Sequence, residues 1–105
     1  MNKEQLKKEI KKALQNNLEK YSYSFYMTKK QMENNTATIL IGNMHYKVEN
    51  ENKSYWVNYD IDTQLKLAKQ YENIIKEILK DMAVQTSYEI KREYGLDYLY
   101  IRLNY

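Results

Sequence analysis

A stripe of apolar residues between positions 67 and 82 constrains the fold of this chain more than any other sequence feature. Its members recur every three or four positions, so they line one face of an α-helix. They are Leu67, Ala68, Tyr71, Ile74, Ile75, Ile78, Leu79 and Met82. Asp60 or Asp62 can cap this helix, because a carboxylate accepts hydrogen bonds from free N–H groups of the first turn. A helix with one broad apolar face needs a second layer to cover it.

A shorter stripe near the beginning of the chain predicts another helix, from Lys3 to Glu19. Its apolar residues again follow the 3.6-residue period. They are Leu6, Ile10, Ala13, Leu14 and Leu18. The opposite side is lysine-rich, as a solvated helix face is, and carries Lys7, Lys8, Lys11 and Lys12.

Between the two helices the apolar period changes to two, which indicates strands. Gly42 and Asn43 separate two strand-like runs, and glycine accepts the positive φ of a type II′ turn, so we expect a hairpin there. The second arm of this hairpin would turn Met44, Tyr46 and Val48 toward the core. Four strands are predicted between the helices, at residues 21–27, 36–41, 44–49 and 54–59, with a further turn at residues 50–53.

The segment from residue 84 to residue 94 fits two patterns. Every second residue from Val84 to Ile90 has a high strand propensity, as in a half-buried strand. The helical alternative places Ile90 and Tyr94 on one side and ends at Gly95, a suitable residue after a helix. We favour a continuation of the second helix and leave the strand as the alternative.

These elements predict a single α+β domain spanning residues 1–105, since a chain of 105 residues is of ordinary size for one domain. Residues 98–105 supply the closing strand. The expected order is α-β-β-β-β-α-β. We therefore predict a two-layer sandwich, with a mainly antiparallel sheet of about five strands and two helices on one face.

The residue types needed for most catalytic and metal sites are scarce. The chain has no cysteine, which excludes disulfides, thiolate zinc sites and thiol nucleophiles. His45 is the only histidine, and we interpret it as a surface residue. With two glycines, Gly42 and Gly95, the chain cannot build a phosphate-cradling loop or a dinucleotide fingerprint. We expect no enzyme activity, no catalytic, cofactor-binding or metal-binding residues, and no cofactor.

The sequence also contains no signal for a membrane. The first residues lack the apolar stretch of a secretory signal, and no apolar run approaches the ~18 residues that a membrane span needs. Together with the absence of cysteine, this predicts a cytoplasmic protein without membrane partners.

Charge gives only weak support for nucleic-acid binding. The net charge is +3, and the first 20 residues hold the whole excess, with six lysines and three glutamates. A protein that neutralises roughly six to ten phosphates usually has a larger surplus. A nucleic-acid-binding module therefore stays the alternative function, in which Lys7, Lys8, Lys11 and Lys12 would meet phosphates while Trp56 and tyrosines stack on bases.

Tyrosine is the residue type in which the composition departs most from an ordinary domain, with twelve in the chain. If Leu99, Ile101 and Leu103 face the helices, the residues between them must face the other way, because strand side chains alternate. Tyrosine, tryptophan and arginine are enriched where proteins bind one another. The predicted partner-binding residues are Trp56, Tyr98, Tyr100 and Arg102.

The many lysine, asparagine, tyrosine and isoleucine residues fit a gene written in AT-rich codons, which suggests a phage or mobile element of a low-GC bacterium. We therefore expect a small non-catalytic binding protein that inhibits a host macromolecular machine by occlusion, as anti-CRISPR proteins do. Its partner would be a host protein or nucleoprotein complex, with nucleic acid secondary. A homodimer could also cover the aromatic face. The sequence leaves the partner and the oligomeric state open.

Overall fold

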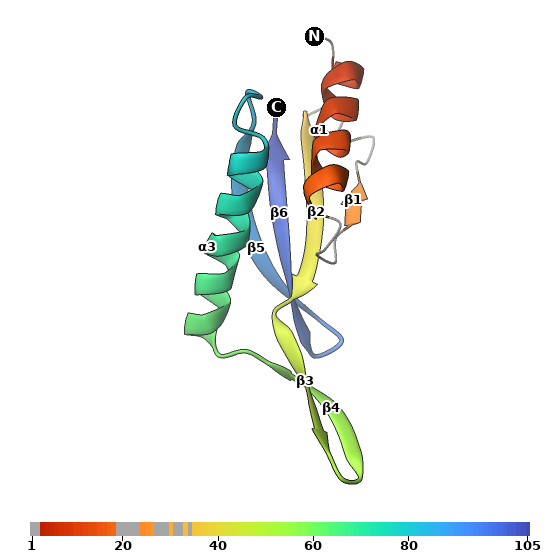
Figure 1. The fold of residues 1–105 in the computed structure, drawn as a ribbon, viewed down its shortest axis with the longest axis vertical. Coiled ribbons are helices and arrows are strands. Elements are labelled where there is room, and N and C mark those ends of the chain that lie inside the picture. Colours follow the sequence, from red (N-terminus) through yellow and green to blue (C-terminus); the bar gives the residue numbers. More distant parts are fainter. Residues whose placement is uncertain (1–2, 19–23, 27–29, 31–32, 34) are drawn as a thin grey trace.

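The computed structural model describes residues 3–18, 24–26, 30, 33 and 35–105 of the chain. Two helices and six strands run through these residues in an α+β arrangement (Figure 1). In chain order they are α1 (Lys3–Leu18), β1 (Ser24–Tyr26), β2 (Thr36–Asn43), β3 (His45–Asn50), β4 (Lys53–Asn58), α3 (Ile61–Ile78), β5 (Gln85–Glu93) and β6 (Leu96–Asn104).

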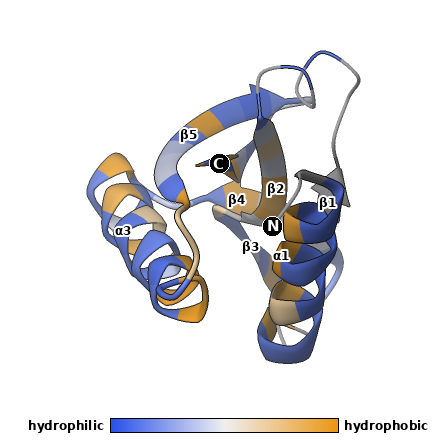
Figure 2. Cartoon of the chain, turned by 90° about the horizontal axis from the view of Figure 1, so that it is seen from above, coloured by the Kyte–Doolittle hydropathy of each residue, from blue (hydrophilic) through white to orange (hydrophobic). Residues whose placement is uncertain are grey.

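The strands divide into two antiparallel sheets. Four of them form a sheet in the order β1-β2-β6-β5, while β3 and β4 form a separate two-stranded ribbon. Both helices lie on the same side of the four-stranded sheet (Figure 2). The predicted α+β class and element order are confirmed, and the structure adds β5 before the closing strand. Neither of the described helices is long and apolar enough to cross a membrane.

The hydrophobic core lies between the two helices and the four-stranded sheet. On β6, Leu99, Ile101 and Leu103 are fully buried, as their alternation predicts. β2 contributes Ala37, Ile39 and Ile41 from its own inner face. The helices cover these residues with side chains at helical spacing, among them Ile10, Leu14 and Leu18 of α1 and Ala68 and Ile75 of α3, and Leu79, the C-cap of α3, adds another.

The helix α3 begins where a capping residue was predicted. Asp60 is the N-cap: one of its carboxylate oxygens accepts a bond of 3.2 Å from the backbone N–H of Thr63, and the other accepts one of 2.6 Å from the Thr63 hydroxyl. The hydroxyl bond is the main reason why the pKa of Asp60 lies below its ordinary value. At the other end of the chain, the predicted end of α1 at Glu19 lies outside the described residues.

The predicted hairpin at Gly42 and Asn43 is wrong. Instead of folding back onto β2, the chain continues from the four-stranded sheet into the ribbon, because β2 pairs with β1 and β6 while β3 pairs with β4. Gly42 does have a positive φ, of 86°. It adopts that conformation at an irregularity where the register of β2 against β6 shifts after Leu40. Gly42 therefore lies at a β-bulge and not in a hairpin turn.

The ribbon is itself a hairpin, and the predicted turn at residues 50–53 is confirmed. Asn50 pairs with Lys53 across two intervening residues. The side-chain oxygen of Asn50 accepts a bond of 3.2 Å from the backbone N–H of Lys53, which closes the turn. Of the strand predicted at residues 21–27, the described part is β1, while Tyr21, Tyr23 and Met27 lie outside the described residues.

The helical interpretation of residues 84–94 is wrong as well. These residues contain β5, which pairs with β6 from Gln85 opposite Asn104 to Glu93 opposite Leu96. Tyr94 and Gly95 connect the two strands, with φ of 53° and 81°. Two positive φ values in a two-residue loop are the mark of a type I′ turn. The strand pattern is the correct one because β5 pairs with β6 along its whole length, which satisfies the backbone groups of β5 that face β6.

Candidate functional site

The β3–β4 ribbon projects beyond the layer formed by the sheet and the helices (Figure 1). None of its residues from 45 to 58, all of which the structure describes, belongs to the hydrophobic core or packs against it. It nevertheless carries three large exposed side chains, Tyr46, Tyr55 and Trp56, with exposed fractions of 40%, 47% and 54%. The expectation that Tyr46 and Val48 turn into the core is therefore wrong, because β3 has left the body of the molecule by that point, whereas Met44 just before it is buried as expected.

The two faces of the ribbon carry different side chains. Lys47 stands opposite Trp56 and His45 opposite Asn58, so these residues share one face. Tyr46 lies on the other face, where its ring centroid is 4.9 Å from that of Tyr59. Each face of the ribbon thus presents at least one large aromatic side chain.

His45 connects the ribbon to the sheet. Its ring centroid lies 5.3 Å from that of Trp56 and 5.2 Å from that of Tyr98, and it meets both rings edge to face. Its Nδ1 is 2.9 Å from the backbone oxygen of Asp97. His45 is half-buried between these neighbours, so its interpretation as a surface histidine describes only part of its environment. Sequence reasoning missed this residue.

Tyr98, Tyr100 and Arg102 extend the surface along β6. They alternate with buried core residues, so they lie on the sheet face turned away from the helices. The Tyr100 hydroxyl donates a bond of 2.7 Å to Glu93, and the Lys91 ammonium lies 5.3 Å from the centre of the Tyr100 ring. We call the continuous row Trp56, His45, Tyr98, Tyr100 and Arg102 the outer strip.

A shallow hollow of about 240 Å³ lies beside the outer strip on the same sheet face. Tyr100 and Arg102 form one side of it and Glu89 and Lys91 of β5 the other. Thr38 of β2, which stands opposite Arg102, also lines it. The hollow is mainly polar and is not an enclosed cavity, so the surface beside the outer strip is concave.

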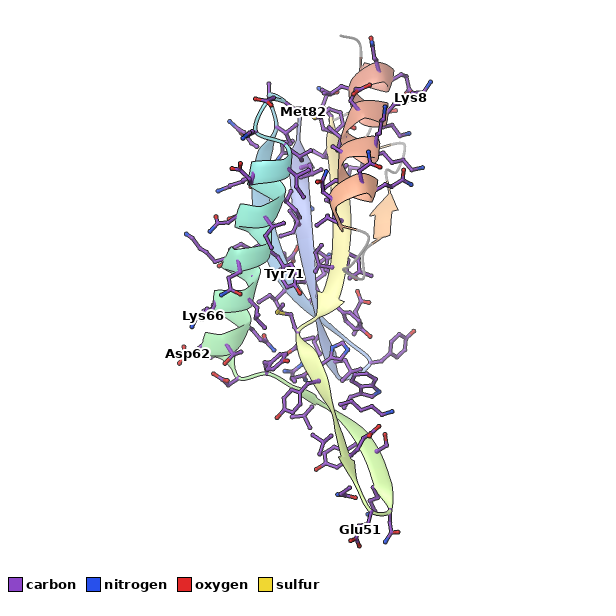
Figure 3. All side chains as sticks on the ribbon, viewed as in Figure 1. Lys8, Glu51, Asp62, Lys66, Tyr71 and Met82 are labelled. Atoms are coloured by element: carbon purple, nitrogen blue, oxygen red, sulfur yellow. The ribbon has the colours of Figure 1, made fainter. Side chains whose placement is uncertain are left out.

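The structure brings the four predicted partner-binding residues onto one surface, but it separates them from the predicted basic patch. Lys8, Lys11 and Lys12 of α1 are exposed and Lys7 is half-buried. Because α1 covers the inner face of the sheet, these lysines and the outer strip lie on opposite faces. Figure 3 shows Lys8 at the end of the molecule far from the ribbon tip at Glu51. The lysines and the aromatic rings therefore do not form one nucleic-acid surface.

A buried carboxylate lies at the base of the ribbon. Asp97 accepts bonds of 2.8 Å and 3.2 Å from the guanidinium of Arg92 and one of 2.6 Å from the side-chain amide of Gln64. The bond from Arg92 is the largest cause that holds the pKa of Asp97 below its ordinary value, while burial acts in the opposite direction. Asp97 is therefore ionised at neutral pH, and its charge is compensated.

Gln64 and Asn58 join this carboxylate to the ribbon. The amide of Gln64, on the first turn of α3, also donates to the backbone oxygens of Tyr59 at 3.0 Å and Met44 at 3.4 Å. Asn58 accepts a bond of 2.8 Å from the backbone N–H of Asp97 and donates one of 3.0 Å to the backbone oxygen of Gly95. We call these side chains, Asp97, Arg92, Gln64 and Asn58, the base network.

The base network fixes the direction in which the ribbon leaves the body. It joins the ribbon to the start of α3 and to Asp97 of β6 through buried or half-buried bonds, which are costly to break, and to the β5–β6 turn through the exposed bond from Asn58 to Gly95. The carboxylate of Asp97 is engaged by Arg92 and Gln64, and Nδ1 of His45 faces a backbone oxygen. What this arrangement can do is hold an aromatic surface in a defined position.

A scan against protein-family models, a search of curated proteins and a search of solved structures each return no match for this chain. A function for this chain therefore has to be inferred from the geometry of the ribbon and the outer strip.

Proposed function

We propose that this chain is a small non-catalytic binding protein that recognises another protein through its ribbon and outer strip. The observation that carries the proposal is the ribbon itself. It contributes no side chain to the core and yet exposes Tyr46, Tyr55 and Trp56. Exposed aromatic area of this size is unfavourable in water and is typical of surfaces that a partner covers.

The chemistry of the outer strip suits a protein partner. Trp, Tyr and Arg are the residues that most often carry the binding energy of an interface, and the strip contains Trp56, two tyrosines and Arg102. His45 packs between Trp56 and Tyr98, so their rings are already held before a partner arrives. A surface that is ordered in advance loses less conformational entropy on binding.

We further propose that binding acts by occlusion, with the chain serving a phage or mobile element as an inhibitor of a host macromolecular machine, in the manner of anti-CRISPR proteins. The support is the narrow ribbon, which can enter a cleft of a larger protein, together with the AT-rich codon signature of the composition. The body behind the ribbon is wide enough to block access once the ribbon is seated.

The experiment that tests this function places a photo-crosslinking amino acid at Trp56 and, as a matched control, at Lys8. Both positions are exposed, but Trp56 lies on β4 of the ribbon whereas Lys8 lies on α1, at the end of the molecule far from the ribbon tip (Figure 3). In a lysate of a low-GC bacterium, Trp56 should form a discrete adduct with one protein, and Lys8 should not. Equal labelling from both positions would contradict the proposal.

The captured protein then allows the affinity to be measured with purified components. We expect Trp56→Ala and Tyr100→Ala each to weaken binding by ~2 kcal/mol or more, which is about thirtyfold, while both variants stay folded. Lys8→Ala should bind as the unmodified chain does. A folded Trp56→Ala variant with unchanged affinity would move the interface away from the ribbon.

A further inference from the structure

The edge strand β5 has a free side. In the strand order β1-β2-β6-β5 it is the last member, so among the described strands it has a neighbour only in β6. The turn at Tyr94 and Gly95 joins Glu93 to its opposite residue Leu96, which makes these two a hydrogen-bonded pair. Glu93 and every second residue before it in β5 therefore direct their backbone N–H and C=O groups toward β6. Tyr88, Ile90 and Arg92 direct theirs to the free side.

The side chains along this free edge are complementary to themselves. Suppose two copies of β5 run antiparallel, with Ile90 of each copy opposite Ile90 of the other. Glu89 of each copy then stands opposite Lys91 of the other, on the outer sheet face, and Tyr88 stands opposite Arg92 on the helix side. This register also matches the outward backbone groups of one copy to those of the other.

The neighbouring registers are unfavourable. The smallest shift that the outward backbone groups permit moves one copy by two residues along the other. In one direction this shift places Glu89 opposite Glu89, and in the other direction it places Lys91 opposite Lys91. Like charges directly opposite each other destabilise a strand pair. The charges of β5 therefore specify the Ile90-centred register among those that its backbone permits.

The side chains that this pairing uses are accessible in the single chain. The side chains of Lys91 and Glu89 are 49% and 58% exposed, and the ion pair that they form with each other along the strand is long, at 3.8 Å. Tyr88 also belongs to the large exposed side chains. Pairing across the edge would give the two charges closer partners and cover part of the Tyr88 ring.

We propose that two copies of this chain associate edge to edge through β5, with the twofold axis at Ile90. The two four-stranded sheets become one sheet of eight strands, with the helices of both copies on the same side. The outer strips then lie together on the opposite side. This inference uses only β5 and does not rest on the proposed function.

The test is sedimentation velocity of the full chain over a concentration series. The unmodified chain should show a monomer–dimer equilibrium. Glu89→Lys and Lys91→Glu should each raise the dimer Kd by about tenfold, because two cross-strand pairs change from attractive to repulsive. Circular dichroism of each variant should match that of the unmodified chain.

Charge reversal in both positions at once distinguishes this register from a general charge effect. The double variant with Glu89→Lys and Lys91→Glu should dimerise again, and an equimolar mixture of the two single variants should form a heterodimer. Control reversals at exposed sites elsewhere, Glu51→Lys at the ribbon tip and Lys66→Glu on α3, should leave the dimer unchanged. A chain that stays monomeric at all concentrations, or a double variant that does not recover, would overturn the proposal.

Discussion

The body of the molecule and the ribbon are built on different principles. The body buries apolar side chains from α1, α3, β2 and β6 in one core, whereas the ribbon buries none there and is held at its base by polar bonds. Hydrophobic burial supplies most of the stability of a small domain. The comparison therefore indicates that the body carries the stability while the ribbon is free to carry recognition.

The largest effect is expected from a cavity in the body. Ile75 of α3 is fully buried, so Ile75→Ala should lower the free energy of unfolding by about 2–5 kcal/mol. Urea unfolding followed by circular dichroism measures the loss. Ile61→Ala is the matched control, because Ile61 begins the same helix but is 63% exposed, and we expect a change within about 0.5 kcal/mol. Similar losses in the two variants would mean that α3 does not pack as described.

Removal of the carboxylate from the base network should have the next largest effect. Asp97→Ala leaves Arg92 and Gln64 without their shared acceptor, and we expect a loss of about 2 kcal/mol. Trp56 is the only tryptophan, so its fluorescence anisotropy reports on the ribbon alone. It should fall in Asp97→Ala while the far-ultraviolet spectrum is kept. An unchanged anisotropy would show that the ribbon does not depend on the base network.

The same carboxylate predicts a dependence of stability on pH. The pKa of Asp97 is below 3.8 in the folded chain, mainly because of the bond from Arg92, so the unfolded chain takes up the proton first as the pH falls. The stabilisation is complete above this value and is lost as the pH falls through the lowered pKa. As the pH falls below about 4, the free energy of unfolding should decrease less steeply in Asp97→Asn than in the unmodified chain. If the free energy of unfolding fell with pH at the same rate in both proteins, other carboxylates would be responsible for the acid sensitivity.

The smallest effect is a gain in stability at the β5–β6 turn. Tyr94 has a φ of 53°, a left-handed conformation that asparagine tolerates better than tyrosine, and Asn-Gly is the preferred type I′ sequence. Tyr94→Asn should therefore raise the unfolding free energy by about 0.5–1 kcal/mol, measured from denaturant midpoints. Tyr94→Ala keeps the backbone penalty and should gain less. An equal gain from alanine would assign the effect to loss of the exposed ring.

Most of the body could be predicted from the sequence because its signals are local. The 3.6-residue stripes identified α1 and α3, and the alternation of Leu99, Ile101 and Leu103 identified the inner face of β6. The same alternation placed Tyr98, Tyr100 and Arg102 on the outer face. In these segments the period of the apolar residues matches the observed burial of their side chains, so the sequence pattern is sufficient to predict the element and its buried face.

The connections between these segments could not be predicted in the same way. A glycine with positive φ suits both a turn and a bulge, and only the pairing of β2 with β6 decides that Gly42 serves a bulge. Residues 84–94 fit two periods, and again pairing with β6 decides between them. His45 was missed although the predicted turn at residues 50–53 already places it on the face of Trp56. Its contacts with Tyr98 and Asp97 depend on how the ribbon meets β6, which no local pattern shows.

The geometry at the base of the ribbon allows the length and the sequence of the ribbon to change while the body stays the same. The backbone N–H of Tyr59 donates a bond of 3.0 Å to the backbone oxygen of Met44, so the chain enters and leaves the ribbon at adjacent points. Because the residues from 46 to 57 belong neither to the core nor to the base network, that part of the ribbon can be lengthened, shortened or replaced without removing a core side chain. Each residue added to both strands at the tip would lengthen the reach by about 3.4 Å. One body can therefore carry ribbons that differ in length and in side chains.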